Sequence, residues 1–186
     1  MRRNVNVRTV LWTALLPGML ACRDLSGFTT GGGSFEGEIV SADFVRAGIG
    51  ATVDGGVHAG DPTRLCMTLD ADHLQDAPGV LSTNDGMFHA AAMRTIPQIW
   101  QDPLSTLTFG QGRLKNLVYV VSASKPFPDQ NGVDVFAVVS LMQSGNVEVR
   151  LLRGAPAVPS DATPATAAGN LFAIFELKRQ SAPCSY

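Results

Sequence analysis

The chain of 186 residues is poor in charge, and this scarcity excludes one broad class of partner. Only 16% of its residues are charged, and the formal net charge at pH 7 is −2. No run of lysine or arginine occurs, whereas proteins that bind nucleic acid carry clustered positive charge. We therefore expect no nucleic-acid partner. The apolar fraction of 45% is sufficient for the core of one domain.

Sequence motifs of catalysis are also missing. The chain has no Gly-x-Ser-x-Gly elbow, no P-loop and no Gly-x-Gly-x-x-Gly turn after a strand. Its three histidines show no spacing typical of zinc ligands. A thiol catalyst would need Cys66 or Cys184 beside a histidine in space, and nothing in the sequence points to this. We expect a protein that is not an enzyme and that has no cofactor.

No apolar run is long enough to cross a membrane as a helix. The longest near the N-terminus covers 13 residues, 9–21, whereas a spanning helix needs about 20. Arg2, Arg3 and Arg8 precede this run, and Pro17 and Gly18 interrupt it near its end. A cationic start, a short apolar stretch and a small residue at its end are typical of an export signal.

The four residues Met19-Leu20-Ala21-Cys22 resemble the lipobox of bacterial lipoproteins. In that family the signal is removed before the cysteine, whose thiol receives two fatty acyl chains such as palmitate. The resemblance implies that Cys22 becomes the lipidated first residue of the mature chain, because two or more chains give stable anchoring. Arg23 is not the aspartate associated with inner-membrane retention, which favours the outer membrane. The alternative is an ordinary cleaved signal with an incidental cysteine.

Three regions follow from this signal. Residues 1–21 form the signal peptide, 22–34 a glycine-rich flexible tether after the lipidated cysteine, and 35–186 one domain. Removal of the three N-terminal arginines leaves 11 basic residues against 16 acidic ones, a formal charge of −5.

The number of cysteines is odd, which is unusual for an exported protein. If Cys22 carries lipid, Cys66 and Cys184 remain as a pair in an oxidising compartment. We predict a disulfide between them, closing a loop of more than 100 residues. The alternative is two unpaired thiols.

Strand periodicity dominates after residue 34, and no long amphipathic helix is evident. Residues 80–96 are expected to form a hairpin, because Asn84, Asp85 and Gly86 favour a tight turn. The alanines at 90–92 leave a helical alternative for its second arm. The fold class predicted is all-β, an antiparallel sandwich or barrel of about eight strands. The expected strands or hairpin arms are 35–40, 64–69, 80–96, 104–109, 114–122, 133–142, 147–153 and 171–177.

Two strands carry more detailed expectations. Residues 133–142 are apolar on both faces, as in a central strand. In the last strand, simple alternation places Leu171, Ala173, Phe175 and Leu177 on one side.

The strongest candidate for a cation site combines three carboxylates and one imidazole in residues 70–76: Asp70, Asp72, His73 and Asp76. Carboxylate oxygens and an imidazole nitrogen are suitable metal ligands. The glycine and glutamate of an EF-hand loop are absent at their required positions. The favoured alternative is a solvated acidic turn in which Asp70 or Asp72 caps one helical turn.

Three further residues are candidates for a functional site. His58 lies in a glycine-rich loop near Asp54 and Asp61, and a loop histidine without fixed geometry is more often a surface residue. His89 is expected as a half-buried or surface residue of a strand. Trp100 lies between prolines and is expected to close one end of the core, with the lining of a ligand groove as the alternative.

These observations support a hypothesis for the whole chain. We expect a membrane-anchored lipoprotein whose all-β domain has a binding or structural role in the cell envelope. One alternative is a carrier of a lipid or other apolar ligand, which requires a large apolar pocket instead of a filled core. The other is a periplasmic or surface hydrolase, which requires His58 or His73 to meet a nucleophile and an acid.

Overall fold

The structure is a computed structural model that describes residues 28, 32–44, 56–95, 112–123, 135–153 and 171–186. Within these residues there are nine β-strands and one turn of 3-10 helix, which confirms the all-β prediction. The elements are β1 (Gly33–Ala42), β2 (Arg64–Leu69), η1 (Ala71–His73), β3 (Gly79–Thr83), β4 (Ala91–Ala92), β5 (Arg94–Thr95), β6 (Arg113–Ser122), β7 (Val135–Met142), β8 (Val147–Arg153) and β9 (Leu171–Gln180).

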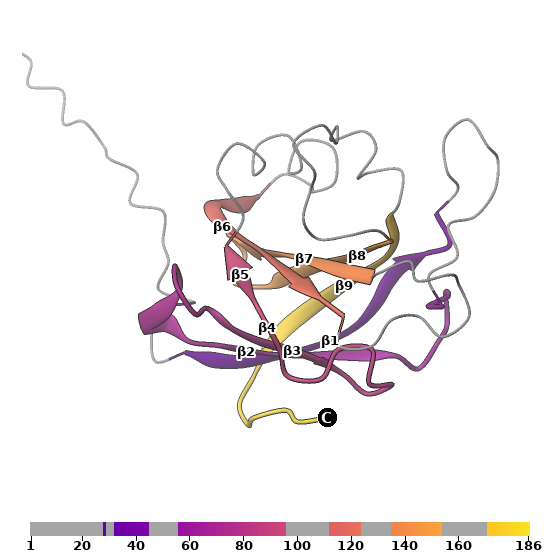
Figure 1. Ribbon diagram of the computed structural model, residues 1–186, viewed down its shortest axis with the longest axis horizontal. Helices are drawn as coiled ribbons and strands as arrows, with labels where there is room; N and C mark the ends of the chain where they lie inside the picture. Colours follow the sequence, from indigo (N-terminus) through magenta and orange to yellow (C-terminus); the bar gives the residue numbers. More distant parts are fainter. Residues whose placement is uncertain (1–27, 29–31, 45–55, 96–111, 124–134, 154–170) are drawn as a thin grey trace, which may run out of the picture.

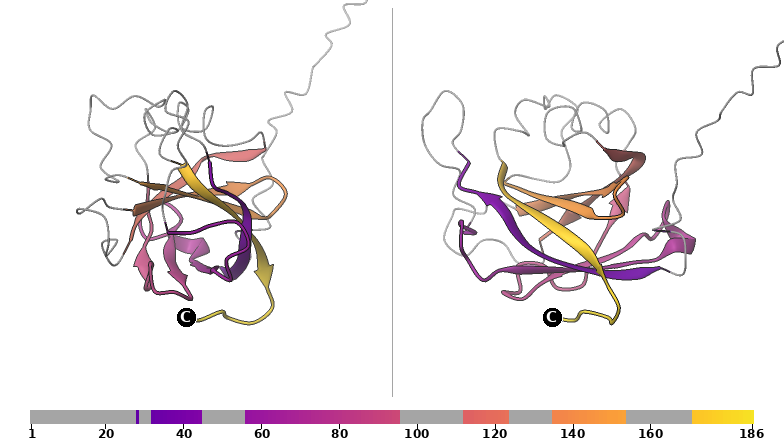
Figure 2. Two further views of the ribbon diagram at one scale, coloured as in Figure 1. Left: turned by 90° about the vertical axis from the view of Figure 1, so that its right-hand side faces the viewer. Right: turned by 180° about the vertical axis from the view of Figure 1, so that it is seen from behind.

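All nine strands belong to one antiparallel sheet in the order β4-β3-β2-β1-β9-β8-β7-β6-β5. The sheet curls until its two ends come close together, as the views in Figures 1 and 2 show. The architecture is therefore a barrel and not a sandwich. Nearly full closure leaves few exposed strand edges, which protects an all-β protein from edge-to-edge association.

A single short segment joins the two ends of the sheet. Ala91–Ala92 pair with β3, and Arg94–Thr95 pair with β6. Between them, Met93 is 2% exposed and belongs to the core. Because β4 and β5 belong to one short segment, this segment connects the two ends of the sheet. The buried side chain of Met93 lies between them.

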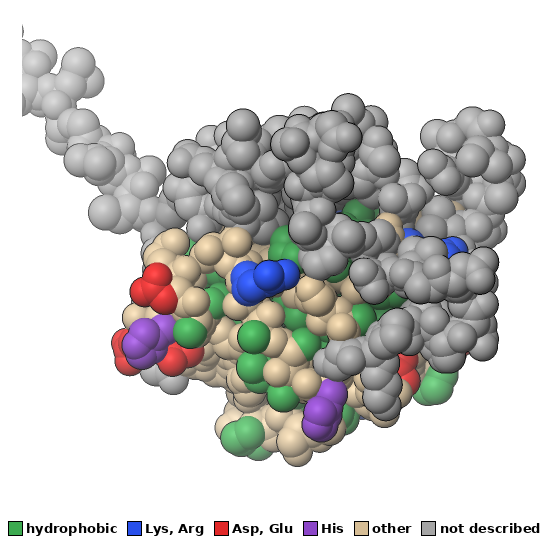
Figure 3. Space-filling view, viewed as in Figure 1, with side chains coloured by type: hydrophobic (Ala, Val, Ile, Leu, Met, Phe, Trp, Pro, Cys, Tyr) green, Lys and Arg blue, Asp and Glu red, His purple; other side chains and the backbone are tan. Residues whose placement is uncertain are grey.

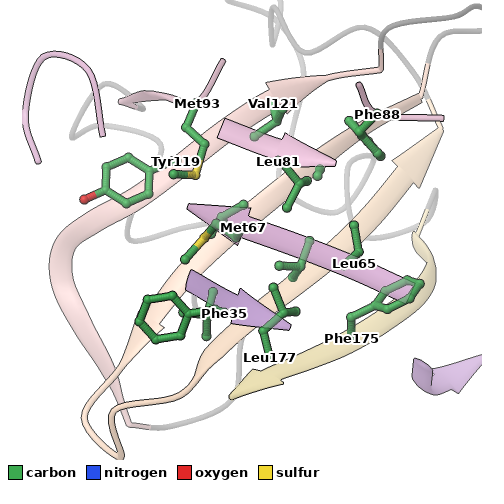
Figure 4. Close-up of a cluster of buried hydrophobic side chains, with 14 of the residues drawn as sticks. Phe35, Leu65, Met67, Leu81, Phe88, Met93, Tyr119, Val121, Phe175 and Leu177 are labelled. Atoms are coloured by element: carbon green, nitrogen blue, oxygen red, sulfur yellow. The ribbon is translucent and has the colours of Figure 1, made fainter. Parts of the chain in front are cut away.

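The barrel interior is filled by side chains that alternate along the strands. Figure 4 shows them pointing toward one another from β1, β2, β3, β6 and β9. Their side chains are almost completely removed from water, and each apolar side chain of this size contributes about 1.5–3 kcal/mol when buried. The largest of them are Phe35, Leu65, Met67, Leu81, Leu114, Tyr119, Leu141, Phe172 and Phe175.

A second apolar cluster lies on the outer face of β6 to β9. Its buried members are Val118, Val120, Phe136, Val138, Leu152 and Leu171. Because β7 contributes to both clusters, seven of its eight residues are buried. This confirms the expectation of a central strand that is apolar on both faces.

The strand positions expected from periodicity are largely confirmed, with two instructive differences. β9 has a bulge opposite Leu151 and Leu152, so Leu171 joins the outer cluster while Ala173 and Phe175 face the interior. The prediction that Leu171 shares their side was therefore wrong. The expected hairpin forms, but its second arm pairs with β3 only through Ala91–Ala92. The expected strand 104–109 lies outside the described residues.

The core begins before the expected domain boundary at residue 35. Phe28, which lies within the expected tether, is 1% exposed. Its ring stacks on Phe35 with 5.8 Å between the centroids and 22° between the planes. Phe28 therefore packs on Phe35 at one end of the barrel.

The predicted disulfide is present. Cys66 in β2 and Cys184 near the C-terminus are bonded, with 5.9 Å between their Cα atoms and 118 positions between them in sequence. The bond fixes the C-terminal tail, residues 181–186, against the outer face of the sheet. In the chain-entropy description, closing a loop of about 100 residues stabilises the fold by about 4.7 kcal/mol.

Candidate functional site

An open groove with a volume of about 650 Å³ lies at one end of the barrel. We call it the rim groove. One wall is the start of β1 and the end of β2 with η1, and the other is the end of β9 with the tail. Its lining residues include Gly32, Ser34, Asp70, Asp72, Arg179 and Pro183. The groove therefore carries both signs of charge together with exposed backbone.

Arg179 supplies the positive charge of the rim groove. Its guanidinium carbon lies 5.5 Å from the centre of the Phe35 ring, and Nη2 donates a hydrogen bond of 2.9 Å to the carbonyl oxygen of Gly32. A cation over an aromatic face is held by the ring quadrupole. These contacts place the charge directly above Phe35, at the mouth of the barrel interior.

Asp70 supplies negative charge on the opposite wall and organises η1. Oδ1 accepts a hydrogen bond of 3.0 Å from the amide of Asp72, so Asp70 is the N-cap residue of the turn. Oδ2 lies 2.9 Å from Nδ1 of His73. The bond to His73 and the amide of Asp72 lower the pKa of Asp70, and Asp70 in turn raises the pKa of His73.

This arrangement agrees with the capped acidic turn and gives no support to a cation site. Asp70, Asp72, His73 and Asp76 are exposed, and acidic side chains gather around a histidine at this end of the molecule in Figure 3. Within the described ranges, no three His, Cys, Asp or Glu residues are grouped so that they could hold a metal ion. Both oxygens of Asp70 already accept bonds from its own turn.

His58 lies at the opposite end of the barrel, where it pairs with Asp43. Nδ1 of His58 is 2.8 Å from Oδ1 of Asp43, whose Oδ2 accepts a bond of 3.0 Å from the amide of Ala59. These bonds, first the one from Ala59 and then the one from His58, lower the pKa of Asp43. The amide of His58 donates to Asp61. In both Asp–His pairs, the histidine is exposed and its ring contacts a carboxylate.

The remaining candidates divide into three groups. His89 is exposed, as expected, but it lies in a bend before β4 and not in a strand. Cys66 and Cys184 are joined to each other, so neither is a thiol nucleophile. Cys22, Asp54 and Trp100 lie outside the described residues.

The C-terminal tail makes a second contact with the outer face of the sheet. The hydroxyl of Tyr186 donates a hydrogen bond to the carboxylate of Glu36, and burial together with this carboxylate raises the pKa of Tyr186 to about 12. Nε of Arg64 lies 3.4 Å from Glu36, and Nη2 lies 3.5 Å from Glu38. Polar contacts therefore hold the tail beside the disulfide.

The sequence did not predict the burial of Phe28 or the contacts of Asp43 and Arg179. Phe28 stands among glycines and polar residues, so periodicity gives no sign of its burial. Asp43 and Arg179 lie 15 and 147 positions from the residues they contact. Only the pairing of β1 with β9 brings Arg179 beside Phe35.

Comparisons with protein families, curated proteins and solved structures give no match. Among the described residues, no helix has the length and hydrophobicity needed to cross a membrane.

Proposed function

We propose that this chain is a bacterial lipoprotein whose barrel serves as a binding or structural component of the cell envelope. The observation that carries the proposal is the Cys66–Cys184 disulfide. Disulfides persist in oxidising compartments, which fits an exported protein. The bond uses two of the three cysteines and leaves Cys22, the residue at the end of the lipobox-like signal, available for acylation.

The filled interior favours a binding or structural role over a carrier of apolar ligands. A carrier barrel encloses a cavity that is wide enough for its ligand. Here large side chains from opposite strands meet in the middle of the barrel (Figure 4). The rim groove is open and lined by charged groups, so it suits a polar ligand better than an apolar one.

A hydrolase is supported less well. The exposed Asp–His pairs resemble two members of a catalytic triad, but the described thiols are both bonded. The lipid on Cys22 would anchor the mature protein to a membrane. The outer membrane is favoured, because Arg23 and not an aspartate follows Cys22.

Metabolic labelling with a radioactive or alkyne-bearing palmitate tests the proposal in a bacterial host. We expect label in the wild-type protein, recovery in the membrane fraction, and loss of both in Cys22→Ala. Cys184→Ser is the matched control, because it removes a cysteine outside the signal and should keep the label. Equal labelling of wild type and Cys22→Ala would refute lipidation of Cys22.

A further inference from the structure

The anchor and the barrel are separated by very little chain. Phe28 is buried against Phe35, and only residues 23–27 lie between it and Cys22. Because an extended chain covers at most 3.3–3.6 Å per residue, the Cα atoms of Cys22 and Phe28 can be at most about 22 Å apart. If Cys22 is acylated, the end of the barrel that holds Phe28 must therefore lie close to the lipid head groups.

The rim groove lies at this same end. Its lining includes Gly32, Gly33 and Ser34, which follow Phe28 by only a few positions. From here β1 runs for ten residues, or about 30 Å, to the opposite end, where Asp43 pairs with His58.

The charges of the groove select among lipid head groups. Arg179 can attract a phosphate, and the carboxylate of Asp72 can attract an ammonium group on the other wall. The negative charge of Asp72 disfavours a lipid whose head group is only anionic. A head group with a phosphate and an ammonium group matches both walls.

We propose that the rim groove faces the membrane to which the chain is anchored and binds the head group of a zwitterionic phospholipid such as phosphatidylethanolamine. The orientation rests on the proposed function, because it requires that Cys22 carries a lipid. The match between the groove and the head group rests on Arg179 and Asp72. The distal end, with Asp43 and His58, then faces away from the membrane.

Amide hydrogen exchange of the acylated mature protein in lipid nanodiscs tests both parts. One disc contains phosphatidylethanolamine and phosphatidylglycerol, and the other contains phosphatidylglycerol alone. We expect peptides covering 70–76 and 180–185 to exchange several-fold more slowly in the first disc than in the second, with no change at 56–63. Arg179→Gln and Asp72→Asn should each remove the protection. Arg64→Gln, which removes an exposed arginine outside the groove, should retain it.

The outcomes separate the parts of the proposal. Equal protection in both discs would overturn the zwitterionic ligand, and protection at 56–63 would overturn the orientation. Titration of full-length protein with dihexanoyl phosphatidylethanolamine, which is monomeric at low concentration, tests the groove independently of acylation. Binding that is lost in Arg179→Gln supports the groove even if Cys22 carries no lipid. Absence of binding refutes it even if Cys22 is acylated.

Discussion

Two halves of the barrel present outer faces of different chemistry. In the stapled half, β1 to β3, the outer face carries the Cys66–Cys184 bond and the contacts of Glu36 with Arg64 and Tyr186. In the apolar half, β6 to β9, the outer face carries the cluster that includes Val118, Phe136 and Leu152. Both halves share one interior core, so the difference lies only outside the barrel.

Two sources of stability serve one sheet. The stapled half buries apolar groups mainly on its inner face, so a covalent bond between distant parts of the chain adds stability there. The apolar half removes apolar surface from water on both faces, at about 25 cal/mol per Å².

Removal of the disulfide should have the largest effect. We expect Cys66→Ser combined with Cys184→Ser to lower the free energy of unfolding by about 4 kcal/mol, because the closed loop is long. Urea denaturation followed by circular dichroism measures this change. A loss below about 1 kcal/mol would show that the stapled half does not depend on its bond.

The same truncation on the two outer faces should give very different results. Val138 in β7 is 1% exposed and Val40 in β1 is 58% exposed. We expect Val138→Ala to lower the free energy of unfolding by about 2 kcal/mol, from lost burial and the cavity left behind. The effect of Val40→Ala should be below about 0.5 kcal/mol. Similar losses for both variants would abolish the contrast between the halves.

The sequence predicted features that depend on neighbouring residues. It did not predict features that depend on contacts between distant strands. β2 and β8 were predicted with their correct bounds, because alternation and nearby turn residues are local signals. The bulge at Phe172 was missed, because it depends on how β9 pairs with β8. The polar end of β9 at residues 178–180 was missed for a similar reason, since pairing with β1 and not hydrophobicity extends the strand.

The candidate site shows the same limit. The capped turn at Asp70 could be predicted, because the cap and the amide of Asp72 are two positions apart. The rim groove could not, because Arg179 reaches it from the last strand. The pair of Asp43 with His58 likewise depends on a contact across a long connection.

A smaller effect is expected inside the shared core. The hydroxyl of Tyr119 is buried and has no hydrogen-bond partner in the described part of the chain, and burial raises the pKa of this side chain. A buried hydroxyl without a partner is destabilising, so we expect Tyr119→Phe to leave the free energy of unfolding unchanged or to raise it by about 1 kcal/mol. Thermal denaturation measures this. A destabilised variant would reveal a partner for the hydroxyl.

The smallest effect concerns the exposed turn next to the stapled half. Asp70 raises the pKa of His73 above 6.5, so His73 stabilises the fold at pH values below 6.5, and this contribution disappears as the pH rises through its raised pKa. The pKa of Asp70 is lowered from 3.8, so its contribution exists above that value and disappears as the pH falls through the lowered pKa. The interaction of Asp70 with His73 therefore contributes most to stability at pH values between the lowered pKa of Asp70 and the raised pKa of His73.

Asp70→Asn tests this pair by NMR titration of the His73 ring protons. We expect the titration midpoint to move down toward 6.5. Asp61→Asn, which alters a carboxylate bonded to His58, is the control and should not move it. An unchanged midpoint in Asp70→Asn would show that another group holds the proton on His73.

We propose that Cys22 holds this barrel at a membrane. The mass of the N-terminal peptide of the mature protein, isolated from membranes, tests it most directly. We predict a chain that begins at Cys22 and carries the added mass of two or three acyl chains. An unmodified N-terminus at any other residue would contradict the claim.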